Sequence, residues 1–91
     1  MNTLMIGYDL YHRSPRAYGA LTEAIKELGS WWHELDSTWF VSTSLTPVEV
    51  RDILNHYLRP GDMLLVLALP PLWWAASGLG QEDAAWLHER L

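Results

Sequence analysis

A short apolar run near the start of the chain, from Leu4 to Leu10, constrains the fold most strongly. Seven residues are too few for a stable helix, and a continuous apolar run of this length is typical of a strand that is buried on both faces. The run contains Asp9, and the polar loop 12–16 follows it. We therefore expect a central strand that ends at the rim of a sheet, with Asp9 held beside this loop.

Two helices are predicted by capping signals and by apolar residues at helical spacing. The first begins with Ser14 as N-cap and Pro15 as first helical residue. It ends at Gly29, a residue that the left-handed position after a helix favours. The second begins at the capping box formed by Thr46 and Glu49, with a proline in its first turn.

Three further strands are predicted after the first helix. Residues 30–35 and 38–43 are rich in aromatic and β-branched residues and flank the turn-prone dipeptide 36–37, which predicts a hairpin. Both faces of this hairpin carry aromatic residues, so the sequence leaves open which face is buried. The continuous apolar run from Met63 to Leu69 predicts a second buried strand, which two prolines end.

The predicted order of elements is strand, helix, strand, strand, helix, strand, with an additional helix within residues 81–91. This is the ferredoxin-like, split βαβ arrangement of an α+β sandwich. Right-handed crossovers place the two helices on one face of the sheet and give the strand order 4-1-3-2. We expect one domain over residues 1–91, with a βαββαβ core in 1–69 and a C-terminal tail and helix in 70–91. If uncovered, the other sheet face would be an aromatic-rich surface of the kind used for dimerisation or partner binding.

Composition narrows the classes of partner and compartment. The net charge is −5, with one Lys and five Arg, which disfavours tight nonspecific binding of nucleic acid and favours a basic protein partner. The absence of Cys suits a reducing cytoplasm. The longest apolar run, 63–71, is too short to span a bilayer, and no basic segment precedes an apolar stretch at the N-terminus. We expect a cytoplasmic protein with no membrane contact.

Six Trp residues are many for 91 residues, because a core of this size is too small to hide all of them. Trp is favoured at protein interfaces, so we expect an interface that includes Trp31, Trp32, Trp39, Trp73 and Trp74. For each of them the alternative is that the ring fills the core. Stacking of nucleic-acid bases is a further alternative, which the acidic charge disfavours.

Several of these stretches resemble one group of small bacterial proteins. The stretch 6–10, Ile-Gly-Tyr-Asp-Leu, followed by Tyr18, Gly29 and the hairpin around Trp39, resembles proteins often labelled "SinR family", which are related to VapD and to CRISPR-associated protein 2. Residues 29–39 are most specific to the SinR-labelled group, and Trp86-Leu87 with Leu91 is similar to its ending. The resemblance covers nearly the whole chain. To VapD and the CRISPR protein it is looser, and rests on the order of elements and on the Tyr-Asp-Leu strand end.

The resemblance implies a ferredoxin-like homodimer. In its nuclease members the Asp that ends the first strand comes from both subunits and meets a divalent metal at the dimer seam, and Asp9 stands at that position here. Two such carboxylates can hold Mg²⁺ and activate a water on a phosphodiester. The alternative is that Asp9 only ends the strand, caps a turn or pairs with Arg13 or Arg16.

The other candidate residues give weaker signals. Arg13 and Arg16 are candidates for binding a phosphate with their forked donors, or else belong to a solvated loop and helix start. The four His are scattered and none lies at metal-ligand spacing from another His or a Cys, so no zinc site is predicted.

Two functions follow as hypotheses, and the sequence leaves open whether the chain is an enzyme. The one we favour is a small cytoplasmic homodimer that binds another protein, of the toxin–antitoxin, immunity or defence-associated kind. The alternative is a metal-dependent endonuclease, acting on RNA or DNA, with Asp9 at the dimer seam and Mg²⁺ as its metal. No other cofactor is indicated.

Overall fold

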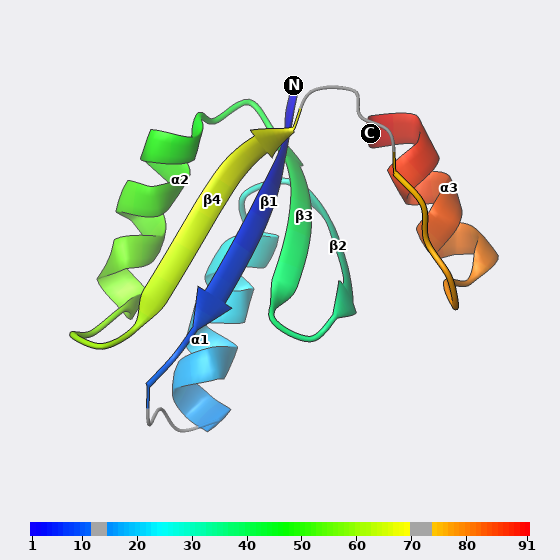
Figure 1. The fold of residues 1–91 in the computed structure, drawn as a ribbon. Helices are drawn as coiled ribbons and strands as arrows, with labels where there is room; N and C mark the ends of the chain where they lie inside the picture. Colours follow the sequence, from blue (N-terminus) through cyan, green and yellow to red (C-terminus); the bar gives the residue numbers. More distant parts are fainter. Residues whose placement is uncertain (12–14, 70–73) are drawn as a thin grey trace.

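The computed structural model describes residues 1–11, 15–69 and 74–91. Within these residues the chain forms a four-stranded antiparallel sheet, three α-helices and one 3-10 turn (Figure 1). The predicted α+β class and the additional C-terminal helix are confirmed. In chain order the elements are β1 (Asn2–Asp9), α1 (Pro15–Lys26), β2 (Ser30–Leu35), β3 (Thr38–Thr43), α2 (Pro47–Leu54), η1 (Asn55–Tyr57), β4 (Met63–Leu69) and α3 (Gln81–Arg90).

Strand β1 lies inside the sheet, and its neighbours are β3 and β4. Antiparallel pairing sets Leu4 opposite Val41 on β3 and Ile6 opposite Val66 on β4. The sheet order is β2-β3-β1-β4, which is the predicted order and makes β2 and β4 the edge strands. The predicted hairpin of β2 and β3 is confirmed, with a register shift between Trp32 and Leu35.

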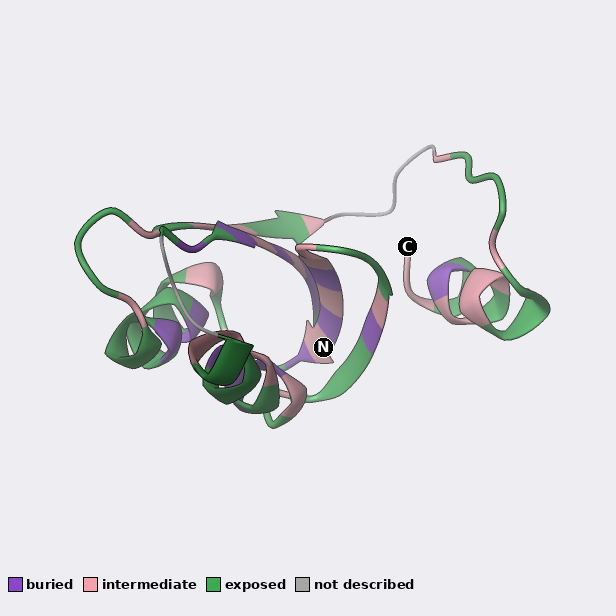
Figure 2. Cartoon of the chain, turned by 90° about the horizontal axis from the view of Figure 1, so that it is seen from below, coloured by how far each residue is buried: buried purple, intermediate pink, exposed green. Residues whose placement is uncertain are grey.

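One face of the sheet packs on α1 and α2 and contains the main core (Figure 2). Side chains alternate between the two faces of a strand, so the helix-facing residues of β1 and β3 are every second residue. Trp39 and Val41 point to this side, so the face of β3 that carries them is buried against the helices. Burial of each large apolar side chain contributes about 1.5–3 kcal/mol. The buried residues that meet here include Leu4, Ile6, Tyr8, Leu21, Ile25, Trp39, Val41, Val50 and Leu54.

Helix α2 begins where its capping box predicted. The Thr46 hydroxyl accepts a hydrogen bond from the backbone N–H of Glu49 at 3.2 Å, and the Glu49 carboxylate accepts one from the backbone N–H of Thr46 at 3.0 Å. Two N–H groups that the helix itself leaves unpaired are therefore satisfied. This reciprocal pair fixes the path of the chain from β3 into the second helix.

Gly29 follows α1 but does not act as the predicted left-handed cap. The glycines with positive φ are Gly61 and Gly78. A Cβ at Gly29 would collide with the carbonyl oxygen of Ser42, the residue that pairs with Ser30 where β2 begins. The left-handed cap is therefore wrong, and Gly29 is required because β2 joins β3 at this point.

The C-terminal part of the chain covers the β2–β3 half of the second sheet face. Figure 2 shows α3 beyond β2, on the side away from α1 and α2. The Thr3 hydroxyl donates to the backbone oxygen of Arg90 at 2.9 Å, and the Trp86 indole N–H donates to the Ser30 hydroxyl at 3.1 Å. No helix in the described parts of the chain is long and apolar enough to cross a membrane.

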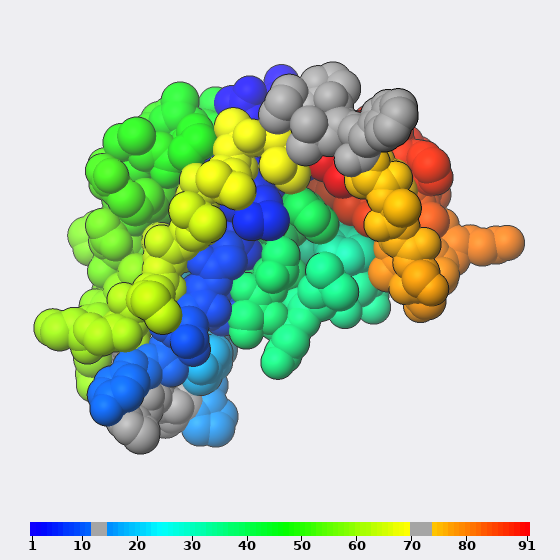
Figure 3. Space-filling model, viewed as in Figure 1, coloured from blue at the N-terminus to red at the C-terminus, as the bar shows by residue number. Residues whose placement is uncertain are grey.

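The β1–β4 half of the same face is left open. Met63, Leu65 and Leu67 are 62%, 56% and 40% exposed, and we call these three residues the β4 row. Figure 3 shows β4 in yellow along this open face, beside β1 in blue. The prediction that the last strand is buried on both faces is therefore wrong for one face, because β4 is an edge strand whose outer face nothing in the described chain covers.

Candidate functional site

Asp9 is the last residue of β1 and lies on the open face of the sheet. Leu4, Ile6 and Tyr8 point to the helices, so Asp9 points the other way, and its register partner on β4 is Met63. Asp9 is exposed, as expected for a residue at the sheet rim. Among the described residues, its side chain has no hydrogen-bond or ion-pair partner. The carboxylate is therefore accessible at the end of the β4 row.

A shallow hollow next to Asp9 is shaped by Gly7. Gly7 pairs with Leu65, and nothing lies within 4 Å of the position that a Cβ of Gly7 would occupy. The hollow is lined by both of these residues, by Asp9 and by Met63, among others. Apolar side chains therefore lie beside the Asp9 carboxylate on an open surface.

A second carboxylate, that of Asp62, lines the same hollow, but its oxygens already accept hydrogen bonds from the backbone of a loop. One of its oxygens accepts from the backbone N–H of Tyr11 at 2.8 Å, and the other accepts from the backbone N–H of Arg59 at 2.9 Å. Gly61 makes this turn at φ +94°, and a Cβ at this position would contact the side chain of Tyr11. The stretch 59–62 is typical of a turn that ends a helix, so a turn at Asp62 is predicted from the sequence, but the bond of its carboxylate to Tyr11 is not.

The described residues of one chain do not assemble a metal site around Asp9. The described residues contain no group of three or more His, Cys, Asp or Glu placed to hold a metal ion. Mg²⁺ usually takes one or two carboxylates and keeps several waters. A single copy offers one accessible carboxylate here, because the oxygens of Asp62 already bind backbone N–H groups. A second carboxylate for Asp9 would have to come from another molecule.

The two candidate phosphate ligands have different outcomes. Arg13 lies outside the described residues. Arg16 is exposed in the first turn of α1 and makes no ion pair with Asp9. Figure 1 shows that α1 begins at the end of the sheet where β1 ends, so the helix start that carries Arg16 and the strand end that carries Asp9 lie at the same end of the molecule. The alternative in which Arg16 neutralises Asp9 is wrong.

Two of the predicted interface tryptophans are buried within the chain. Trp39 is 1% exposed in the core, where its indole N–H donates to the phenol oxygen of Tyr8 at 3.1 Å. Trp32 is 4% exposed on the opposite face of the hairpin, and its ring lies 5.2 Å from that of Phe40. Within a single chain both rings are therefore packing residues.

The remaining predicted interface tryptophans lie at the edges. Trp31 is 43% exposed on β2, with the Lys26 ammonium 5.1 Å from its ring centre. Trp74 is half-buried, and its ring lies 4.9 Å from that of His88 on α3. Trp73 lies outside the described residues. Of the described tryptophans, Trp31 offers the most exposed ring, and the open sheet face is aliphatic where the sequence predicted aromatic residues.

The site that the geometry defines is therefore the open β1–β4 face, made of the β4 row with Met5 beside it and Asp9 at its end. Met5 is half-buried and pairs with Leu67. One signal in the sequence could have indicated this open face: the predicted strand order already placed the fourth strand at an edge of the sheet. In comparisons with family models, curated proteins and solved structures, nothing matches the chain.

Proposed function

We propose that this chain is a small homodimeric protein-interaction module of the toxin–antitoxin, immunity or defence-associated kind, built on a ferredoxin-like fold. The observation that carries the proposal is the β4 row, three exposed apolar side chains in line on an otherwise open sheet face. A contiguous apolar patch on a protein surface is typical of an interaction site. Kinship with the SinR-labelled proteins is part of the same proposal.

A second copy of the chain is the occupant that suits this face. The β4 row and Met5 are apolar, and Gly7 leaves room between them and Asp9. Two sheets pack face to face when each offers such a surface, about 10 Å apart. A two-fold interface uses the same patch on both subunits, so no second apolar patch is needed. A small chain also gains stability from the apolar area that a partner covers.

The surface left for another protein is the outer side of the two core helices. Glu23 on α1, Glu27 just after it, and Glu49 and Asp52 on α2 are exposed there. The net charge of −5 supports a partner with a basic surface, because complementary charge speeds association and disfavours wrong partners.

The dimer is tested by placing a charge in the middle of the β4 row. We expect the wild-type chain to scatter light as a particle of twice 10.5 kDa, and a folded Leu65→Glu variant as a particle of 10.5 kDa. The matched control is Val48→Glu on α2, where the native side chain is also 56% exposed but the helix packs on the other face of the sheet. A wild-type chain that is monomeric at every concentration, or a Val48→Glu variant that dissociates equally, would contradict the dimer.

A second candidate function is supported by the accessible carboxylate of Asp9. Asp9 lies at the end of the open face, so a dimer formed through the β4 row can bring two copies of this carboxylate to one seam. Mg²⁺ bound there would supply an activated water for attack on a phosphodiester. In this function the chain is a metal-dependent endonuclease, and Asp9 of each copy holds the ion.

Cleavage of nucleic acid separates the two functions. Wild type, Asp9→Asn and Asp52→Asn are incubated with labelled RNA and double-stranded DNA in Mg²⁺, in Mn²⁺ and in chelator. Asp52 is the control because it is an exposed carboxylate on α2, held 2.9 Å from Arg51. Metal-dependent cleavage that Asp9→Asn abolishes and Asp52→Asn retains, with the dimer intact in both, supports the nuclease. No cleavage under any condition eliminates it.

A further inference from the structure

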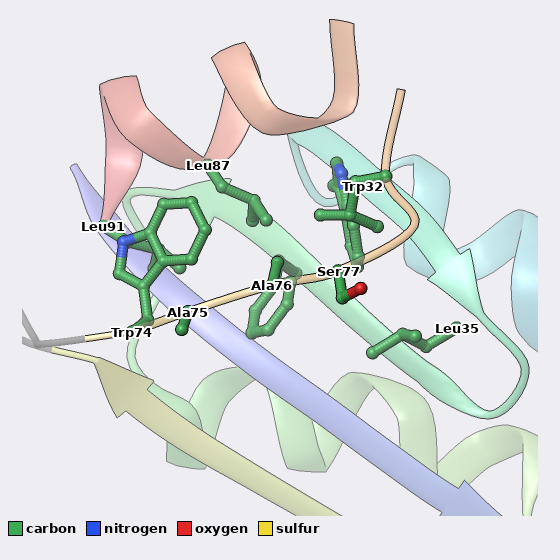
Figure 4. Close-up of a pocket in the computed structure, with 10 residues that line it drawn as sticks. Trp32, Leu35, Trp74, Ala75, Ala76, Ser77, Leu87 and Leu91 are labelled. Carbon is green, nitrogen blue, oxygen red and sulfur yellow. The ribbon is translucent and has the colours of Figure 1, made fainter. Parts of the chain in front are cut away.

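A pocket of about 280 Å³ lies between the C-terminal part of the chain and the outer face of the β2–β3 hairpin (Figure 4). Trp32 and Phe40, whose ring centres are 5.2 Å apart, line it from the sheet, and Leu87 lines it from α3. Figure 4 shows Trp74 and Ala76, from the segment that precedes α3, around the same space. The pocket is therefore formed where three parts of the chain meet.

The walls of this pocket offer apolar contacts almost exclusively. Among the described residues that line it, Ser77 is the one polar residue and none has an ionisable side chain. Leu35 also lines the pocket and is 50% exposed, so the fold leaves part of this apolar lining in contact with water. A molecule that covers the lining removes apolar surface from water, which favours binding. A charged molecule would lose its hydration here without finding a partner of opposite charge.

Two walls of the pocket are fixed by hydrogen bonds, and the third is not. The Trp86 indole N–H donates to the Ser30 hydroxyl at 3.1 Å, and the Thr3 hydroxyl donates to the backbone oxygen of Arg90 at 2.9 Å, so α3 is tied to the sheet near both of its ends. Residues 74–79, which form the third wall, make no backbone hydrogen bond within the described chain. A segment of this kind is displaced at little cost in free energy. A molecule can therefore enter while the sheet and α3 keep the shape of the pocket.

We infer that this pocket binds a small, uncharged, apolar molecule of about the size of two fused rings. An apolar cavity of about 150 Å³ holds benzene, and about 280 Å³ is nearly twice that volume. Ligand pockets are usually lined by apolar and aromatic side chains, as this one is. The site lies over the β2–β3 half of the sheet and does not involve the β4 row, so the inference does not rest on the proposed dimer.

Indane and benzimidazole test the polarity of the site, because they share the same fused-ring shape and only benzimidazole carries polar nitrogens. Each is titrated into ¹⁵N- and ¹³C-labelled protein while the Trp32 indole N–H signal and the Leu87 methyl signals are recorded. We expect indane to shift both sets of signals and to bind with a dissociation constant below about 1 mM. Benzimidazole should bind at least about tenfold more weakly, because its nitrogens lose water and gain no partner on the apolar walls.

The same substitution at two exposed leucines locates the site. Leu35→Glu places a carboxylate on the pocket lining and should weaken the binding of indane by more than about tenfold. Leu65→Glu is the matched control, since Leu65 is 56% exposed and lies on the β4 row, and it should leave the affinity unchanged. Both native side chains are at least half exposed, so we expect both variants to fold.

Three results would overturn the inference. The first is that indane does not bind the wild-type chain, and the second is that benzimidazole binds it as tightly as indane does. The third is that Leu35→Glu binds indane no more weakly than Leu65→Glu, which would place the bound molecule outside this pocket.

Discussion

The indole N–H of Trp39 donates a hydrogen bond to the phenol oxygen of Tyr8 at 3.1 Å, in the core between the sheet and its helices. The two residues belong to neighbouring strands, and both are at most 9% exposed. This bond links Trp39, the largest fully buried side chain, to β1, the strand that ends in Asp9. It therefore helps to hold β1 and β3 together.

We predict that Tyr8→Phe lowers the free energy of unfolding by about 1–3 kcal/mol, because the buried N–H of Trp39 loses its acceptor. Urea denaturation measures the change. Tyr18→Phe is the comparison, since the hydroxyl of Tyr18 is only part-buried and donates to the backbone oxygen of Leu10 at a longer 3.3 Å. A loss in Tyr8→Phe no larger than the loss in Tyr18→Phe would argue against the buried bond.

Two glycines should respond in opposite directions to the same substitution. Gly29→Ala should destabilise the fold by more than about 1 kcal/mol, because its Cβ collides with the carbonyl oxygen of Ser42. Gly19→Ala should stabilise it by about 0.5–1 kcal/mol, since Gly19 lies within α1 with open space around the new Cβ. Thermal or urea unfolding of both variants measures this. Equal changes of the same sign would show that the approach of β2 to β3 is not as close as described.

The capping box of α2 predicts a third change in stability. Thr46→Ala removes the acceptor for the Glu49 N–H and should cost about 1 kcal/mol. Thr46→Ser keeps the hydroxyl and should leave the unfolding free energy within about 0.5 kcal/mol of wild type. If the two variants unfold at the same urea concentration, the cap does not contribute to stability.

Local signals in the sequence predicted most of the elements. The box of Thr46 and Glu49 fixed the start of α2, and the runs on either side of Asp36 and Ser37 predicted the hairpin, because both features act over a few residues. Gly29 was interpreted wrongly, because its requirement comes from Ser42, which is distant in sequence. The chemistry of one residue does not reveal a contact of that kind.

Which strand faces are buried was harder to predict than the order of the strands in the sheet. The run from Met63 to Leu69 is apolar throughout, so it does not indicate which face the chain leaves open. The answer depends on where α3 lies, and α3 covers β2 rather than β4. The position of Asp9 at the sheet rim was predicted from its place at the end of an apolar run, and the structure leaves it exposed there. Whether Asp9 holds a metal ion was not predictable from one chain, because a second carboxylate would have to come from another molecule.

The most direct test of the central claim is the solvent accessibility of the Met63 methyl group in solution. In one chain Met63 is 62% exposed and Met1 is 94% exposed, so a soluble nitroxide should broaden both methyl signals strongly if the chain is alone. The proposed dimer covers the β4 row, so we predict that the Met63 signal is protected while the Met1 signal is not, and that Leu65→Glu removes the protection. Equal broadening of Met63 and Met1 in the wild-type chain at high concentration would contradict the claim that a second copy covers this face.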